Sequence, residues 1–153
     1  MPKIKLVSWD VYGTLIATGN DETSDVEELE SLRARPGALE ALSEIKSRKI
    51  IQCTCSDGDL ENLKKNLKEA RIDYIDFFDD LYKMTPWEPK DFSYIIQNYQ
   101  IKPENLLVIG DNHDIDIVHA KVQGCQTFWV PELNKHRNNP LDVEKIKRFL
   151  DLE

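Results

Sequence analysis

Residues 4–15 read IKLVSWDVYGTL, and this stretch decides the fold. The apolar run from Ile4 to Trp9 predicts a buried strand, and Asp10 stands where that strand ends. A second apolar run, Leu106 to Ile109, stops at the sequence GDNHDID of residues 110–116. In an open parallel sheet, ligands bind outside the carboxyl ends of the strands, so acids at two such ends are placed to share one cation. We therefore predict a catalytic site at this edge of the sheet.

Strands and helices alternate along the rest of the chain. Pro36-Gly37 opens a helix whose apolar residues recur at spacings of three and four from Ala38 to Ile45. Strands are expected at residues 4–9, 50–55, 74–78, 106–109 and 127–130, and helices at 24–31, 38–45, 60–70, 92–99, 115–122 and 143–150. Such alternation implies right-handed crossovers, so we predict an α/β fold with a mostly parallel sheet covered on both faces.

Length and composition favour one ordinary domain, residues 1–153. Because no apolar run approaches the length of a membrane span and the charged start lacks the core of a secretion signal, we expect a cytoplasmic protein without membrane contact. The formal net charge of −8 argues against nucleic acid as a partner. Cys53, Cys55 and Cys125 are interpreted as small buried apolar residues, not as a disulfide or zinc framework.

Taken in order, these pieces resemble the haloacid dehalogenase-like hydrolase superfamily over nearly the whole chain. The resemblance implies a Rossmann-like three-layer α/β/α sandwich and the Mg²⁺-dependent phosphatase activity of most members. Asp10 sits at the position of the family's nucleophile, which forms an aspartyl-phosphate. Ser56 matches the hydroxyl that donates to a phosphoryl oxygen, and Asp111 with Asp116 fits the magnesium motif. A carboxylate suits the nucleophilic role because it is ionised at neutral pH and a metal shields its charge.

The resemblance also implies how the site residues divide the work on a phosphorylated substrate. The expected Mg²⁺ ligands are Asp10, a backbone carbonyl near Tyr12, Asp111 and Asp116. The expected contacts of the phosphoryl group are Gly13, Thr14, Ser56 and Lys90, of which Ser56 and Lys90 join Asp10 as catalytic residues. Such a site works by positioning and charge neutralisation.

Tyr12 departs from the phosphatase pattern, which has a second aspartate there as acid to the leaving group and then base toward water. A tyrosine does not accept a proton in that way near neutral pH, because its unperturbed pKa is about 10. We therefore expect a preference for substrates with good leaving groups. The form Asp-x-Tyr-Gly-Thr-Leu also resembles the 2-haloacid dehalogenases, in which the aspartate attacks carbon and halide leaves without a proton.

The family's third motif supplies a lysine, and the usual spacing would place it at Pro86. Lys90, at the start of the following helix, is the first replacement, and Lys83 is the second. Only about twenty residues follow the first motif before the next helix, which leaves no room for a dehalogenase-like cap. The chain thus resembles capless members, which act on large substrates or close their sites with a neighbour. The sequence leaves open whether the protein forms a homo-oligomer. If a neighbouring subunit closes the site, we expect it to contact Trp87 and residues 83–89.

Several residues near the motifs have simpler interpretations. Asp114 is interpreted as a helix-start acid favoured by the helix dipole, and His113 as a solvated loop residue. Trp87 is interpreted as a packing residue near the mouth of the site. Asp57 either affects the site or caps a helix. The acidic stretch of residues 25–30 is expected to be a solvated helix face.

Three functions compete on this evidence. The leading hypothesis is a magnesium-dependent phosphohydrolase that acts through an aspartyl-phosphate on Asp10. A 2-haloacid dehalogenase-type hydrolase is suggested by Tyr12 and disfavoured by the missing cap; release of halide without metal would favour it. The third is a catalytically weak regulatory protein that binds metal and phosphate. Mg²⁺ affinity without turnover on a broad phosphate panel would favour that reading.

Overall fold

A five-stranded parallel sheet forms the centre of the computed structural model, which describes residues 3–17, 32–133 and 139–151. The strands lie in the order β3-β2-β1-β4-β5. Their bounds are Leu6–Trp9 for β1, Ile51–Ser56 for β2, Asp80–Lys83 for β3, Leu106–Gly110 for β4 and Gln126–Trp129 for β5. The chain runs outward from β1 to β3 and then crosses to β4, so the strand order reverses beside β1. An open α/β sheet forms its ligand crevice at such a point.

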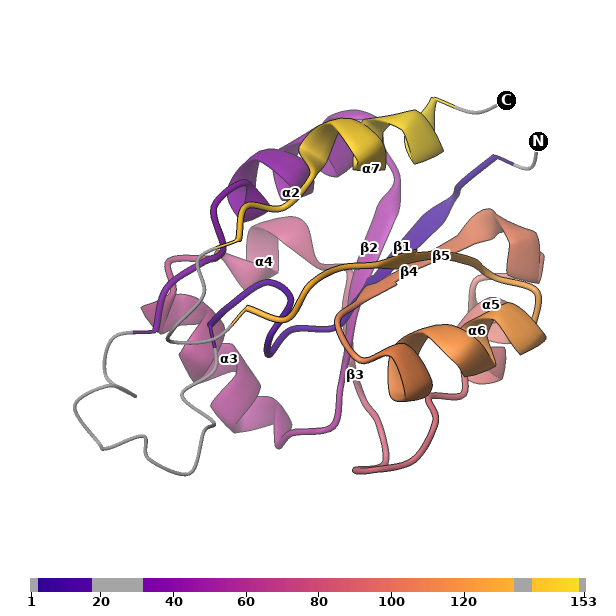
Figure 1. Ribbon diagram of the computed structural model, residues 1–153, viewed down its shortest axis with the longest axis horizontal. Helices are drawn as coiled ribbons and strands as arrows, with labels where there is room; N and C mark the ends of the chain where they lie inside the picture. The colour runs from indigo at the N-terminus through magenta and orange to yellow at the C-terminus, as the bar shows by residue number, and fades with distance from the viewer. Residues whose placement is uncertain (1–2, 18–31, 134–138, 152–153) are drawn as a thin grey trace.

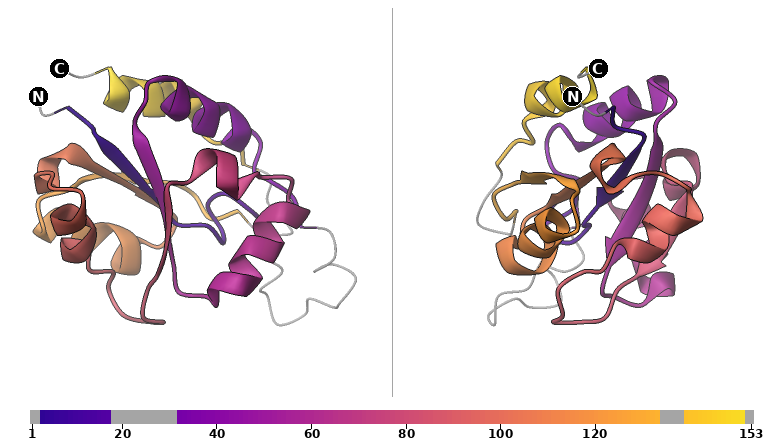
Figure 2. Two further views of the ribbon diagram at one scale, coloured as in Figure 1. Left: turned by 180° about the vertical axis from the view of Figure 1, so that it is seen from behind. Right: turned by 90° about the vertical axis from the view of Figure 1, so that its right-hand side faces the viewer.

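Helices cover both faces of the sheet (Figure 1, Figure 2). One face packs against α2 (Ala38–Ser47), α3 (Leu60–Glu69), α4 (Tyr74–Phe77) and α7 (Val143–Leu150). The other packs against α5 (Ser93–Asn98) and α6 (His119–Val122). The short turns η1 (Pro103–Asn105) and η2 (His113–Val118) stand on either side of β4 in the sequence. These layers confirm the predicted α/β/α sandwich.

Alternating side chains of the central strands supply two hydrophobic cores. Val7 and Trp9 of β1 pack with Ile109 of β4 on the face covered by α2 and α7. Leu6 and Val108 belong to the core under α5 and α6. The division follows from strand geometry, since successive side chains point to opposite faces. All four residues of β1 are buried, as expected of a central parallel strand.

Most other elements lie where the sequence pattern predicted them. The apolar stripe of α2 is buried from Ala38 to Ile45, as predicted. The helix and the solvated acidic face expected before residue 32 fall on 18–31, outside the described residues. Across the ranges that the structure describes, no helix combines the length and the apolar character that crossing a membrane requires.

The strand predicted at residues 74–78 is wrong. Tyr74–Phe77 form the short helix α4, and the third strand is β3. Asp73 caps this helix, because its side chain accepts a hydrogen bond from the backbone N–H of Asp76 at 3.2 Å. An apolar run this short carries no clear period, so the side-chain cap decided between strand and helix.

Candidate active site

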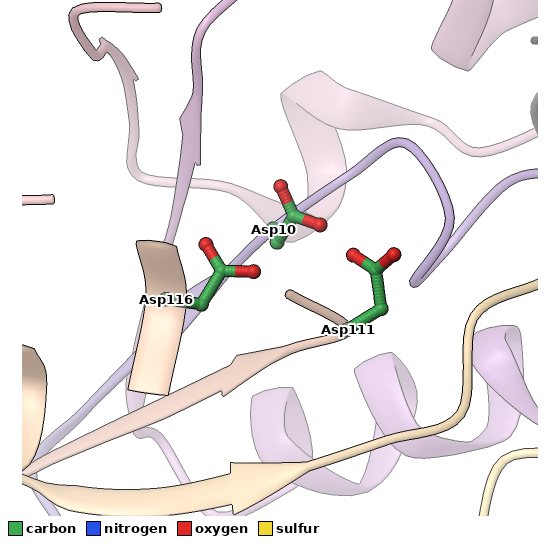
Figure 3. Close-up of side chains that lie close together, drawn as sticks. All are labelled: Asp10, Asp111 and Asp116. Carbon is green, nitrogen blue, oxygen red and sulfur yellow. The ribbon is translucent and has the colours of Figure 1, made fainter. Parts of the chain in front are cut away.

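Three aspartates from two strand ends converge at the carboxyl edge of the sheet (Figure 3). Asp10 follows β1, Asp111 follows β4, and Asp116 lies on η2. One carboxylate oxygen of each lies within 4.8 Å of the other two. Figure 3 shows the three carboxylates turned toward one another. The acids that the sequence placed at separate strand ends thus form one cluster.

The π-helical turn η2 aims Asp116 at the other two acids. Its start is shaped by Asn112, whose side-chain oxygen accepts from the backbone N–H groups of Asp114 (3.1 Å) and Ile115 (3.0 Å). The Asn112 N–H in turn donates to Asp116 Oδ2 at 3.1 Å, which fixes this buried carboxylate. Turns of this kind are rare and often occur at functional sites. Asp114 lies in the first turn of η2 with its side chain 93% exposed, as expected of a helix-start acid. His113 differs from its interpretation as a solvated loop residue, because it lies on η2 and its half-exposed ring packs against Trp129, with the ring centroids 4.7 Å apart.

Thr14 and Gly13 connect the first motif to Asp111. The Thr14 hydroxyl lies 3.0 Å from Asp10 Oδ2 and 3.1 Å from Asp111 Oδ1. Gly13 has a φ of 83°, and a Cβ at this position would come within 2.6 Å of Asp111 Oδ2. Only glycine therefore lets the loop after β1 approach Asp111 this closely.

Lys90 is buried and pairs with two of the acids. Its Nζ lies 3.0 Å from Asp10 Oδ1 and 2.6 Å from Asp116 Oδ1, and it donates to the Cys55 carbonyl oxygen at 2.7 Å. Burial alone would lower the pKa of Lys90, but Asp10 and Asp116 outweigh burial and raise that pKa above its usual value. Lys90 therefore stays a cation. Lys83, the second candidate for this role, is exposed at the end of β3.

Burial also raises the pKa of Asp10 and of Asp116. Desolvation raises the pKa of Asp10 to about 7; Lys90 opposes the shift, and the neighbouring Asp111 adds to it. Desolvation and the charge of Asp10 raise the pKa of Asp116 to about 6, again against Lys90. Three carboxylates around one ammonium leave an excess of negative charge, so a further cation would stabilise the cluster. The donor set consists of carboxylate oxygens, the ligands that Mg²⁺ takes in proteins, and therefore fits that ion.

Tyr12 lines the site and does not act as a proton acceptor there. Asn66 donates a 2.7 Å hydrogen bond to the Tyr12 hydroxyl. The ring lies beside Gly58, where an added Cβ would be 3.5 Å away. Burial raises the pKa of Tyr12, and the charges of Asp57 and Asp59 raise it further against the effect of Asn66. The phenol is therefore protonated at neutral pH and does not replace the missing aspartate as a base.

Ser56 ends β2 and is almost fully buried. Its hydroxyl has no hydrogen-bond partner within the described ranges. The preceding residue is Cys55, whose carbonyl oxygen accepts from Lys90. An unpaired buried hydroxyl is costly, and donation to a phosphoryl oxygen would remove that cost. Ser56 does not itself line the cleft over the acids, so the contact expected for its hydroxyl stays a prediction.

A cleft of about 280 Å³ opens over the acids. Asp116, Lys90 and Gly13 are the buried residues of its lining. Its lining also includes Tyr12, Asp57, Trp87, Ile115 and Glu132. Asp57 does not cap α3, because the cap is Asp59, which accepts from the Asn62 N–H at 3.3 Å. Asp57 lines the cleft instead, and its effect on the site stays a prediction.

Arg35 and Trp129 support the site from outside the predicted motifs. The buried Arg35 guanidinium donates to the carbonyl oxygens of Thr14 (3.3 Å) and Pro131 (2.6 Å), which joins the loop after β1 to the segment after β5. The Trp129 indole N–H donates to the Asp111 carbonyl oxygen at 3.0 Å. Sequence reasoning missed both residues because their partners are backbone groups of distant segments.

Gly110→Ala is expected to disable the acid cluster while the sheet persists. A Cβ at Gly110 would lie 2.4 Å from Asp116 Oδ2 and 2.7 Å from its Cβ, so the Asp116 carboxylate has to move. We expect Mg²⁺ affinity, measured by isothermal titration calorimetry, to fall at least about tenfold. Gly58→Ala is the control, since its Cβ would make an ordinary contact with Tyr12. Equal Mg²⁺ affinity in both variants would contradict the argument.

Comparison with known proteins places this geometry in a family. A family model described as haloacid dehalogenase-like hydrolase matches residues 18–124, which include Ser56, Lys90, Asp111 and Asp116. A glyceraldehyde 3-phosphate phosphatase from Pyrococcus furiosus is 30% identical over 103 residues. This match takes in 64% of the chain and 42% of the relative, so the chain spans less than half the length of that protein.

Solved structures share the fold at lower identity. A predicted phosphoglycolate phosphatase from Haemophilus somnus has a TM-score of 0.70 at 16% identity, covering 96% of this chain and 92% of the other. The putative hydrolase YfnB from Bacillus subtilis, solved bound to magnesium, has a TM-score of 0.70 at 15% identity, covering 98% of this chain and all 100% of the other. With the family model matching most of its length, this chain belongs to the haloacid dehalogenase-like hydrolases.

Proposed function

We propose that this protein is a Mg²⁺-dependent phosphohydrolase that acts through an aspartyl-phosphate on Asp10. The observation that carries the proposal is the cluster of Asp10, Asp111 and Asp116 around the buried Lys90, at the base of an open cleft. Membership in a hydrolase family and similarity to a phosphatase support it. Mg²⁺ held by the three carboxylates would shield the nucleophile from the charge of the substrate and stabilise charge on the phosphoryl oxygens.

Asp10 supplies the nucleophile in this mechanism. One of its carboxylate oxygens bonds to phosphorus while the bond from phosphorus to the leaving oxygen breaks, and the leaving group departs with that electron pair. Lys90 faces the negative charge of the transferring group, and the Ser56 hydroxyl donates to one of its oxygens. The single proton of the Thr14 hydroxyl is directed at the Asp10 and Asp111 carboxylates, so Thr14 positions these two acids. Water then attacks phosphorus and loses a proton to solvent, which releases inorganic phosphate and restores the Asp10 carboxylate.

Tyr12 restricts the leaving groups that this site handles. It stands where other members of the family have a carboxylic acid to protonate the departing oxygen, and burial raises its pKa, which makes the phenol a weaker proton donor than a carboxylic acid. Aryl and acyl phosphates release stable anions and do not need that proton. Alkyl phosphates do need it, and they are therefore poor substrates.

Turnover is expected to depend on both magnesium and the leaving group. Release of p-nitrophenol from its phosphate ester with Mg²⁺ is expected to fall at least about 100-fold when a chelator is added, because the bare acids repel the substrate. Glycerol phosphate, an alkyl ester, is expected to react at least about 100-fold more slowly than the aryl ester. Initial rates of phosphate release measure both effects.

Other results would point to the competing functions. Halide release from a 2-haloacid in chelator, with no phosphate release from any ester, would favour a dehalogenase. Mg²⁺ binding with no turnover of either kind would favour a regulatory protein. Equal rates on alkyl and aryl esters would contradict the role given to Tyr12 while leaving the phosphohydrolase intact.

A further inference from the structure

Trp87 lines the cleft and combines a highly exposed side chain with an unfavourable backbone conformation. Its side chain is 87% exposed, so it contributes little to the hydrophobic core. Its backbone φ is 64°, a left-handed conformation that bulky residues rarely adopt. Unfavourable backbone conformations of this kind cluster at ligand sites. The fold therefore holds a large aromatic side chain in the open, beside the cleft, at a cost in stability.

Other apolar groups line the same cleft. Tyr12 and Ile115 both belong to its lining. The Tyr12 ring is fixed by the hydrogen bond from Asn66 and by its contact with Gly58. Aromatic side chains hold flat partners by stacking and by burial of apolar area. The cleft thus combines an ionic base with aromatic groups nearer to solvent.

The charges outside the acid cluster have one sign. Asp57 and Glu132 line the cleft and are exposed. Among the described residues that line it, Lys90 is the only cation, and Lys90 is already paired with Asp10 and Asp116. A second negative charge on a bound substrate would meet repulsion from the two exposed carboxylates, with no lining cation to offset it.

Resting on the proposed phosphohydrolase function, we propose that the substrates are phosphate monoesters of flat leaving groups that carry no negative charge. Trp87 and Tyr12 bind the flat group, and Asp57 with Glu132 disfavours substrates that carry a carboxylate or a second phosphate. The proposal agrees with the demand for a good leaving group, because oxygen on an aromatic ring departs more readily than alkyl oxygen. Trp87 is then a specificity-determining residue.

Phosphonates separate this binding from the chemistry, because their carbon–phosphorus bond has no leaving oxygen. With Mg²⁺-loaded protein, we expect calorimetry to show phenylphosphonate binding about 3- to 10-fold tighter than cyclohexylphosphonate, and tighter still than methylphosphonate. We expect 4-carboxyphenylphosphonate to bind about 3- to 10-fold more weakly than phenylphosphonate, because of the rim acids.

Variants assign these differences to residues. Trp87→Ala is expected to weaken phenylphosphonate about 3- to 10-fold and methylphosphonate by less than about twofold, while Trp87→Phe keeps most of the affinity. The double variant Asp57→Asn/Glu132→Gln is expected to remove most of the penalty on 4-carboxyphenylphosphonate. Tyr94→Ala is the matched control, because Tyr94 is 66% exposed on α5 and does not line the cleft.

The proposal is overturned if Trp87→Ala binds phenylphosphonate as wild type does, or if phenylphosphonate and cyclohexylphosphonate bind equally. It is also overturned if sedimentation shows that Trp87→Ala converts a dimer to a monomer, since Trp87 would then be an interface residue. Failure of the proposed function looks different: phenylphosphonate would bind with the expected selectivity, and wild type would release no phosphate from p-nitrophenyl phosphate.

Discussion

Asp10→Asn is expected to abolish turnover and, in the absence of metal, to stabilise the protein. An amide is a poor nucleophile and a poor metal ligand, so the rate on p-nitrophenyl phosphate should fall at least about 10³-fold. The free energy of unfolding in chelator should rise by about 1–2 kcal/mol, because the amide buries no charge. Activity and stability thus change in opposite directions at this position.

The sign of the stability change follows from the pKa of Asp10. This carboxyl titrates near 3.8 when unfolded and at about 7 in the metal-free fold. The folded carboxylate therefore costs no stability below pH 4, costs more as the pH rises, and has its full effect above pH 7. The full shift corresponds to about 4 kcal/mol and already includes the attraction of Lys90. The expected gain is smaller because the amide nitrogen of asparagine does not accept hydrogen bonds from Lys90 or Thr14 as the carboxylate does. For a chain of this size, 1–2 kcal/mol corresponds to a rise in Tm of about 3–6 °C.

Asp114→Asn is the control for this experiment. Asp114 belongs to the same acidic motif, but its side chain is 93% exposed. We expect its activity to match wild type and its Tm to fall by no more than about 1–3 °C, because an exposed acid at a helix start contributes less than about 1 kcal/mol. Saturating Mg²⁺ should stabilise wild type more than Asp10→Asn, because wild type offers the full set of ligands. An Asp10→Asn variant that retained turnover, or that was less stable than wild type in chelator at pH 8, would contradict the account of the site.

The apolar period of the sequence predicted those helices and strands that are held in place by a buried face. The stripe of α2 and the buried run of β1 have a strong apolar pattern, and both formed as predicted. Residues 74–78 have no such pattern, and Asp73 made them helical through a local hydrogen bond. The third strand, β3, has no buried residue, so burial left little trace in its sequence. Elements of this kind need the tertiary structure before they can be assigned.

The sequence motifs predicted the aspartates of the site. They did not predict the residues that hold the surrounding loops in place. The aspartates stand at strand ends that the sequence marks, but Arg35 binds backbone carbonyls of segments about a hundred residues away. Such contacts leave no pattern in the residues that accept them. Asn112 is different, because an Asn in a turn sequence commonly bonds to the backbone a few residues on. That signal was present in the sequence.

Lys90→Met is expected to destabilise the protein strongly and to slow turnover. Methionine fills nearly the same volume, but it leaves Asp10 and Asp116 buried without their ammonium partner. Breaking one side of a buried ion pair costs about 3–5 kcal/mol. Turnover should also fall about 10²- to 10⁴-fold, because the transferring phosphoryl group loses a preorganised cation. Thermal unfolding in chelator and phosphate release with Mg²⁺ measure the two effects.

Lys83→Met is the matched control, because the sequence made Lys83 the second candidate for the same role. Its side chain is exposed at the end of β3. We therefore expect a free energy of unfolding within about 0.5 kcal/mol of wild type and a turnover rate within a factor of about two. Loss of activity in Lys83→Met with activity kept in Lys90→Met would reverse the assignment. The double variant Lys90→Met/Asp116→Asn removes one of the abandoned charges, so it should recover part of the stability and none of the turnover. Because Asp116 is itself an expected Mg²⁺ ligand, the double variant tests the stability alone: recovery of Tm would show that the unpaired charge, and not lost packing, destabilises Lys90→Met.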